Sequence, residues 1–177
     1  MSLSKRCTLT AEWIRDSFIC GGNHACETLH PTVSHSCPVP GQPSGDNECP
    51  CIIVVHSQGG NFGFTAALNA PDKVKALITL EPSGAPDPAK ADAARLKGVP
   101  HLIVWGDFID RHAVWSKLVV NPNKWGQAIV AAGGKVDTFE LPRMGIKGNT
   151  HMMMMDRNSD DVAKLVNDWI EKQGLGN

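Results

Sequence analysis

Residues 52–64 read IIVVHSQGGNFGF, and the order of residue types in this stretch predicts the fold around it. The run of apolar, mostly β-branched residues predicts a buried strand, and the two glycines after His-Ser-Gln predict a tight turn into a helix. One interpretation is purely structural: a strand, a glycine turn and a crossover helix. The other is a nucleophile elbow, in which Ser57 lies at the strand-to-helix turn and its hydroxyl points into a cleft.

The overall composition is that of a globular protein. The chain has 177 residues, of which 42% are hydrophobic and 20% charged, enough for one domain with a sizeable core. A formal net charge of -1 gives no reason to expect nucleic acid or an anionic membrane as a partner. No apolar run reaches the length of a membrane-spanning helix. A signal peptide needs an uninterrupted apolar segment near the N-terminus, and here charged residues interrupt it at Glu12, Arg15 and Asp16. We therefore predict no export signal and leave localisation open.

The composition changes near residue 50. All six cysteines lie at or before Cys51, and residues 1–50 contain three of the seven histidines. A functional interpretation is a small zinc or disulfide module built from Cys20, His24, Cys26, His30, His35 and Cys37. Their spacing matches no regular zinc pattern. We therefore favour an irregular Cys/His/Pro-rich leader over residues 1–50 without a recognised fold, and we predict no metal site and no cofactor.

Residues 51–177 alternate between predicted strands and helices. The predicted strands are 51–56, 74–80, 101–106 and 135–140, and the predicted helices are 60–69, 89–97, 124–132 and 159–173. Short, continuously apolar strands are typical of a sheet that helices cover on both faces. Strands separated by helices require crossover connections, which give a parallel sheet. The prediction is an α/β fold of three layers, in which Ser159 caps the last helix.

Candidate reactive residues follow the predicted strands. In parallel sheets such groups collect at the carboxyl ends of the strands, and here they are Ser57, Glu81, Asp107, Asp110 and, in a later loop, His151. The order serine, acid, histidine is the one found in α/β-hydrolases. A serine hydroxyl needs a neutral imidazole to take its proton, and the imidazole needs a carboxylate to fix its tautomer. Val55 stands where the elbow motif usually has a small residue, so a structural or phosphate-binding turn remains an alternative.

Four strings extend the similarity beyond the motif. They are HSQGG (56–60), LITLEPSG (77–84), VPHLIVWGDFID (99–110) and GIKGNTHMMMMDRN (145–158). With the amphipathic helix that follows, they resemble the esterase 713-like family of α/β-hydrolases over about residues 52–175, roughly the C-terminal half of such an enzyme. The resemblance implies a serine hydrolase that cleaves small carboxylic esters through an acyl-serine intermediate. It implies Ser57 as nucleophile, Glu81 as acid and His151 as base.

The choice of acid has a rival. Most α/β-hydrolases place the acid after the strand that ends here at Gly106, which makes Asp107 and Asp110 rivals of Glu81. The resemblance favours Glu81, which closes the strand nearer the nucleophile and is followed by the stiff Pro82. We expect Asp107 to be a turn or capping residue that accepts backbone N–H bonds. The methionine run 152–155 is predicted to pack in the core beneath the His151 loop, and His56 carries no required role. Core or subdomain packing is predicted for Trp105, Trp115, Trp125 and Trp169.

The same resemblance implies an incomplete domain. Only about fifty residues precede the elbow strand, where the family has four further strands, so residues 51–177 correspond to the C-terminal half of the domain. An oxyanion hole needs the N–H of Gln58 and a second donor from an upstream loop. That loop has no counterpart in residues 1–50. We therefore expect weak turnover, with a catalytically inactive remnant or interaction protein as the alternative. An exposed apolar sheet edge also predicts self-association.

Overall fold

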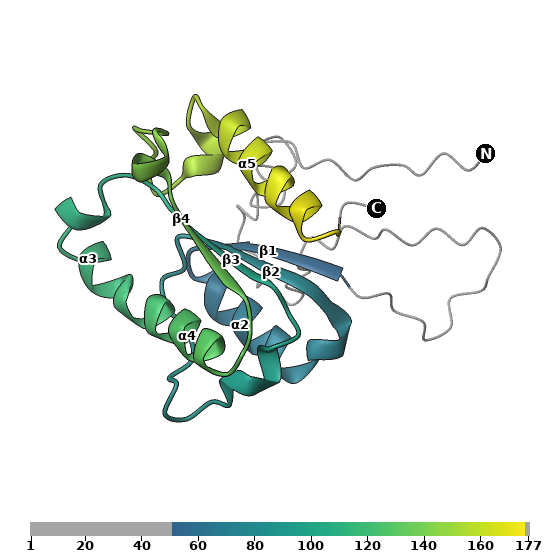
Figure 1. Ribbon diagram of the computed structural model, residues 1–177. Helices are drawn as coiled ribbons and strands as arrows, with labels where there is room; N and C mark the ends of the chain where they lie inside the picture. Colours follow the sequence, from purple (N-terminus) through teal and green to yellow (C-terminus); the bar gives the residue numbers. More distant parts are fainter. Residues whose placement is uncertain (1–50, 176–177) are drawn as a thin grey trace, which may run out of the picture.

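The computed structural model describes residues 51–175. Its centre is a four-stranded parallel sheet in the order β1-β2-β3-β4 (Figure 1). The strands are β1 (Cys51–His56), β2 (Val74–Leu80), β3 (His101–Trp105) and β4 (Val136–Glu140). The predicted parallel sheet is confirmed, and every strand boundary lies within one residue of its predicted place. The leader and its alternative zinc or disulfide module lie outside the described residues.

Helices cover both faces of the sheet, as predicted. Helices α2 (Gly59–Asn69) and α4 (Val120–Ala131) pack on one face, and α5 (Ser159–Lys172) packs on the other (Figure 1). Strand β2 shows the alternation that this requires, because Ile78 packs towards α5 and Leu77 packs towards α2. Both side chains are fully buried.

The predicted helix 89–97 is wrong. This segment contains only the 3-10 turn η2 (Ala93–Leu96). The Asp87 side chain accepts a hydrogen bond from the Ala89 N–H, and Asp92 accepts one from the Ala94 N–H, each at 3.0 Å. Such local side-chain bonds offer the backbone an alternative to a helix, and a run this short gains little from helix propagation.

The remaining connections are short. They comprise η1 (Pro71–Lys73), η3 (Ile109–Arg111), α3 (Trp115–Leu118), η4 (Leu141–Met144) and η5 (Met153–Met155). Helix α4 begins four residues before its predicted start. Its Pro122 lies in the first turn, where a missing N–H costs nothing.

Helix α5 has the predicted buried stripe, with Val166 and Trp169 almost fully enclosed. The predicted cap is wrong: the N-cap residue is Asn158, Ser159 is the first helical residue, and no side chain caps the helix. The Asn158 amide bonds to the Asn149 side chain instead. Asp160 in the first turn still favours the positive end of the helix dipole.

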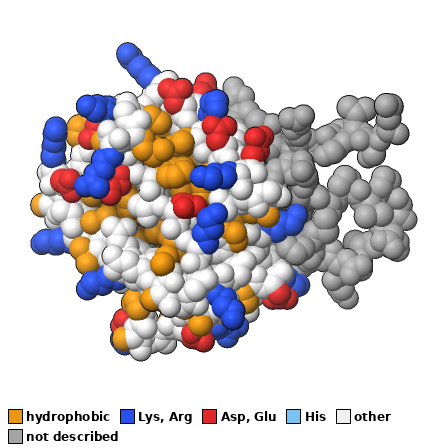
Figure 2. All heavy atoms as spheres, in the orientation of Figure 1, with side chains coloured by type: hydrophobic (Ala, Val, Ile, Leu, Met, Phe, Trp, Pro, Cys, Tyr) orange, Lys and Arg blue, Asp and Glu red, His pale blue; other side chains and the backbone are white. Residues whose placement is uncertain are grey.

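Charge is spread evenly over the face seen in Figure 2, where Lys and Arg side chains alternate with Asp and Glu. Within residues 51–175, no helix combines the length and the apolar character that crossing a membrane requires. The same residues contain no group of three or more His, Cys, Asp or Glu side chains that could hold a metal ion.

A buried histidine lies at the amino end of strand β3, at the opposite end of the sheet from the loops that follow the strands. His101, the first residue of β3, is 1% exposed, and its Nδ1–H donates to the Val99 carbonyl at 2.7 Å. Burial lowers its pKa from 6.5 to about 4, although the hydrogen bond partly opposes this shift. His101 Nε2 is buried without a hydrogen-bond partner, so protonation there would leave an unsatisfied charged donor.

We expect His101 to make the folded chain sensitive to acid. The unfolded chain binds a proton at His101 below about pH 6.5, whereas the folded chain does so only near pH 4. Its contribution is therefore complete above pH 6.5 and falls by about 3 kcal/mol on acidification to pH 4. Urea unfolding of the wild type and of His101→Gln at pH 7.5 and pH 4 measures the difference. Equal losses of unfolding free energy in both proteins would contradict the prediction.

Candidate active site

Ser57 occupies the turn between β1 and α2 with a backbone φ of 52°. This left-handed conformation is rare for residues other than glycine and is a local strain typical of functional turns. The turn is held by the neighbouring strand, because the Ser57 N–H donates to the Leu80 carbonyl at 3.0 Å. The Ser57 carbonyl accepts from the N–H groups of Gly60 and Ser83, both at 3.0 Å. Ser57 therefore has the backbone geometry of a nucleophile elbow.

Glycines allow α2 to lie close to the strands at this turn. A Cβ atom on Gly60 would lie 2.6 Å from the Cβ of Pro82, so a side chain does not fit. A Cβ on Gly63 would lie 2.9 Å from Cγ2 of Val55, and a Cβ on Gly59 would lie 3.5 Å from the Cβ of Val55. The departure from the usual motif at Val55 is thus accommodated by glycines on the facing helix.

Glu81 repeats this arrangement one strand further along the sheet. It follows β2 with a φ of 42°, and its N–H donates to the Val104 carbonyl of β3 at 2.9 Å. The side chain is 1% exposed, and Oε1 accepts from the Gly106 N–H at 2.8 Å. A Cβ on Gly106 would lie 2.5 Å from this oxygen, so a side chain there would displace the carboxylate. The fold holds the carboxylate in one place.

The three predicted triad residues meet at the carboxyl edge of the sheet. His151 Nδ1 lies 2.7 Å from Glu81 Oε2, and His151 Nε2 lies 2.9 Å from Ser57 Oγ. A carboxylate only accepts hydrogen bonds, so Nδ1 carries the proton and Nε2 is left to accept from the serine hydroxyl. This is the arrangement that can remove a proton from Ser57.

The loop that carries His151 is braced by its own side chains. The Thr150 N–H and hydroxyl bond to the two carboxylate oxygens of Asp156 at 2.7 and 3.0 Å. The amides of Asn149 and Asn158 bond to each other at 2.9 and 3.1 Å, and Asn149 is fully buried. The sequence analysis missed these supports, although the residues flank the histidine in the string GNTHMMMMDRN.

The methionine run is divided between the core and the surface. Met153 and Met154 are buried under the His151 loop, as predicted. Met152 and Met155 are 39% and 64% exposed, so the prediction of core packing is wrong for them. The turn η5 rotates successive side chains to different sides.

Asp107 acts as a turn residue, as predicted. Its carboxylate accepts from the N–H groups of Gly148, at 3.1 Å, and Phe108, at 2.9 Å. These bonds, the Gly148 one first, hold its pKa below the usual value. Asp107 thereby joins the end of β3 to the loop that carries His151.

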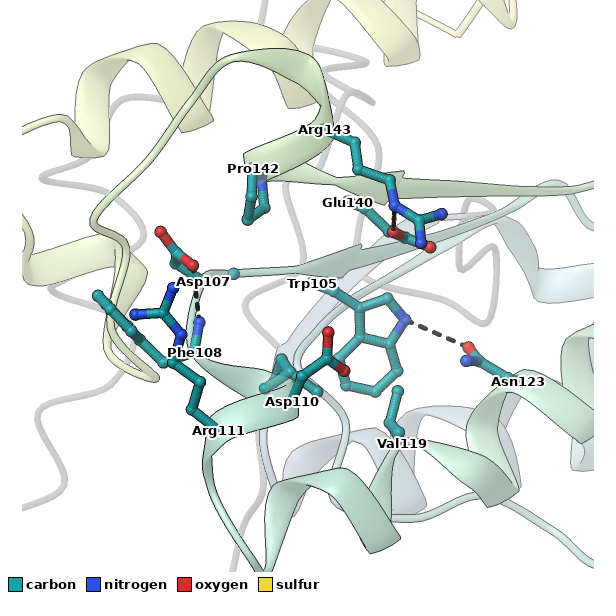
Figure 3. A pocket seen from close by; sticks show the side chains of 12 residues that line it. Trp105, Asp107, Phe108, Asp110, Arg111, Val119, Asn123, Glu140, Pro142 and Arg143 are labelled. Carbon is teal, nitrogen blue, oxygen red and sulfur yellow. Dashed lines mark hydrogen bonds and ion pairs between the residues drawn. The ribbon is translucent and has the colours of Figure 1, made fainter.

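Asp110 lies apart from the three predicted triad residues. It is exposed in η3 and lines a pocket of about 380 Å³ beside the ends of β3 and β4 (Figure 3). Trp105 and Asn123 line the same pocket and are hydrogen bonded at 3.2 Å. Glu81, and not Asp110, is the carboxylate bonded to His151.

Gln58 is the exposed N-cap residue of α2. Its peptide N–H directly follows the serine, at the end of the helix where orphan N–H groups favour negative charge. This is the position that the sequence predicts for the first oxyanion donor.

Comparisons with known proteins agree with this geometry. Residues 50–108 match the family described as alpha/beta hydrolase fold. The chain is 24% identical to the probable secreted lipase phiG of a fungal species (strain ATCC 74256), over 70% of this chain and 46% of that one. It is 37% identical to a novel bacterial esterase of known structure, with a TM-score of 0.65, over 69% of this chain and 38% of that one. The chain thus spans less than half the length of these relatives. The sheet, its helices and these similarities together show that residues 51–175 have the α/β-hydrolase fold.

Proposed function

We propose that this chain carries the catalytic triad of a carboxylic ester hydrolase. Ser57 is the nucleophile, His151 the general base and Glu81 the acid that orients it. The observation that carries the proposal is the hydrogen-bonded series from Ser57 Oγ through His151 to Glu81, at 2.9 and 2.7 Å. The named lipase and esterase relatives favour esters as the substrate class.

The proposed reaction follows from these roles. Ser57 Oγ attacks the ester carbonyl carbon and passes its proton to His151 Nε2, while Glu81 stabilises the imidazolium. The Gln58 N–H faces the developing oxyanion. On collapse, His151 gives the proton to the departing alcohol and an acyl-Ser57 ester remains. Water then attacks this ester with His151 again as base, which releases the carboxylic acid and restores Ser57.

We further propose that the chain falls in the esterase 713-like branch and acts on small esters without a metal or cofactor. The strings around Glu81 and His151 support this branch, because they place the acid after β2 and the base before a methionine run. The second oxyanion donor remains unassigned among residues 51–175. Strand β1 is the terminal strand of the four described, and we propose self-association along this edge, which sedimentation would measure.

Hydrolysis of an activated aryl ester by the full chain tests the function. Loss of one oxyanion donor costs about 10²- to 10³-fold in turnover. We therefore expect measurable hydrolysis at a rate well below that of a complete relative, together with labelling of Ser57 by a fluorophosphonate. Folded protein that neither labels nor hydrolyses would contradict the proposal and favour an inactive remnant or interaction protein. Turnover equal to that of a complete relative would contradict the expected weakness.

A further inference from the structure

Two aromatic rings outside the triad contact the imidazole of His151. The His56 ring centroid lies 4.3 Å from that of His151, with a tilt of 37° between the planes. The Trp115 ring centroid lies 4.1 Å away, with a tilt of 38°. These separations are shorter than the usual spacing of packed aromatic rings. The two rings come from different elements, β1 and α3, so their contact with one imidazole restricts it from two parts of the fold.

His56 also holds the backbone of the histidine loop. Its Nε2 lies 2.7 Å from the carbonyl oxygen of His151. A carbonyl only accepts, so Nε2 is the protonated nitrogen of His56. His56 is 7% exposed and directly precedes Ser57. The last residue of β1 therefore fixes the loop of the base, while the next residue supplies the nucleophile.

The charge state of His56 suits this position. Burial lowers its pKa from 6.5 to about 4; the hydrogen bond to the His151 carbonyl opposes the shift, and the nearby His151 side chain adds to it. At neutral pH His56 is uncharged. It can therefore contact His151 without repelling the positive charge that the base acquires during proton transfer.

Trp115 approaches from the segment after β3. The backbone N–H groups of Trp115 and Val114 donate to His112 Nδ1 at 3.4 and 3.3 Å, and these bonds fix the start of α3. The Trp115 side chain is half-buried, whereas its neighbours Val114 and Ser116 are exposed. The face of an indole attracts a cation, so this ring can stabilise imidazolium as well as limit the motion of the neutral ring. Of the two predicted alternatives for Trp115, core packing is wrong, because its side chain is half-buried against His151.

We propose that His56 and Trp115 are positioning residues that hold the His151 imidazole in line with Ser57. The proposal rests on the proposed function. The hydrogen bond from His56 Nε2 to the His151 carbonyl fixes the position of the loop relative to β1. The contacts of both rings with the imidazole fix its orientation. Neither residue exchanges a proton with substrate.

The rate constant of fluorophosphonate labelling at Ser57 provides the first test. A displacement of about 1 Å in a catalytic group can cost roughly a hundredfold, so we expect His56→Phe and Trp115→Leu each to label about ten- to a hundredfold more slowly. His56→Gln keeps a donor and Trp115→Phe keeps a ring, so both should recover part of the rate. His101→Phe is the matched control, since His101 is also buried and bonded to a carbonyl but begins β3, at the end of the sheet away from Ser57 and His151. It should label at the wild-type rate.

The second readout is the proton resonance of His151 Nδ1–H, followed in the wild type and the variants by ¹⁵N-histidine labelling. A loosened imidazole exchanges this proton faster with water, so the signal should broaden in His56→Phe and Trp115→Leu and stay sharp in His101→Phe. Wild-type labelling rates and sharp signals in both variants would overturn the proposal. If wild-type Ser57 does not label, the proposed function fails, and the resonance still decides the positioning. Circular dichroism identifies any unfolded variant, in which case the conservative substitution at that position decides.

Discussion

Ser57→Ala is expected to abolish fluorophosphonate labelling and to reduce aryl ester hydrolysis to background. In a complete serine hydrolase, loss of the nucleophile costs roughly 10⁶-fold in turnover because no acyl-enzyme forms. Only the hydroxyl group is removed at Ser57, and this group is hydrogen bonded to His151 Nε2 at the carboxyl edge of the sheet, so the fold should persist. Mass spectrometry of the labelled protein and a rate assay measure both effects.

Ser159→Ala is the matched control for this experiment. Ser159 is the first residue of α5, on a helix that packs against the sheet without supplying a triad residue. It should label and hydrolyse like the wild type. Labelling that persists in Ser57→Ala would show that another residue is the nucleophile and would reject the assignment.

Glu81→Gln is expected to lower ester turnover by about 10⁴-fold, the size of the loss when the triad acid of a serine protease becomes an amide. The amide can keep the bond from the Gly106 N–H, so the buried position should stay filled. Its NH₂ group facing His151 Nδ1 favours the opposite tautomer, which leaves Nε2 protonated and unable to accept from Ser57. Turnover of both proteins, with circular dichroism to compare folding, measures the effect.

Asp110→Asn separates the two candidate acids. Asp110 is exposed beside the pocket at the ends of β3 and β4 (Figure 3), so this variant should retain the wild-type rate. A larger loss in Asp110→Asn than in Glu81→Gln would reverse the assignment of the acid.

Strands β1, β2 and β3 could be predicted from sequence because each is a short, mostly apolar run that is followed by glycine or a polar residue. The buried pattern of β2, in which Ile78 and Leu77 face opposite layers, requires only alternation along the chain. The helix predicted over 89–97 was wrong because the alanines of this segment favour a helix, whereas the side chains of Asp87 and Asp92 accept hydrogen bonds from nearby backbone N–H groups. Side-chain competition of this kind depends on geometry that composition does not express.

The site was predictable only in part. Chain order indicated a serine, an acid and a histidine, but local pattern left Glu81 and Asp110 as rivals, and the resemblance to a family favoured Glu81. The contacts of His56 and Trp115 with His151 join residues about 95 and 36 positions apart. No periodicity in the sequence reports such distant pairs. They arise from the register of β1 against β2 and from the path of the chain after β3.

The two strained turns at Ser57 and Glu81 are each tied to the strand beside them, through the carbonyls of Leu80 and Val104. Neither turn can change its conformation alone, because its backbone N–H is hydrogen bonded to a carbonyl of the neighbouring strand. The proposed nucleophile and the proposed acid should consequently reach their positions together as the sheet folds, and lose them together as it unfolds. The rate at which Ser57 reacts with a chemical label should then report how cooperatively the sheet folds. A population in which the serine reacts is one in which β1, β2 and β3 are already aligned.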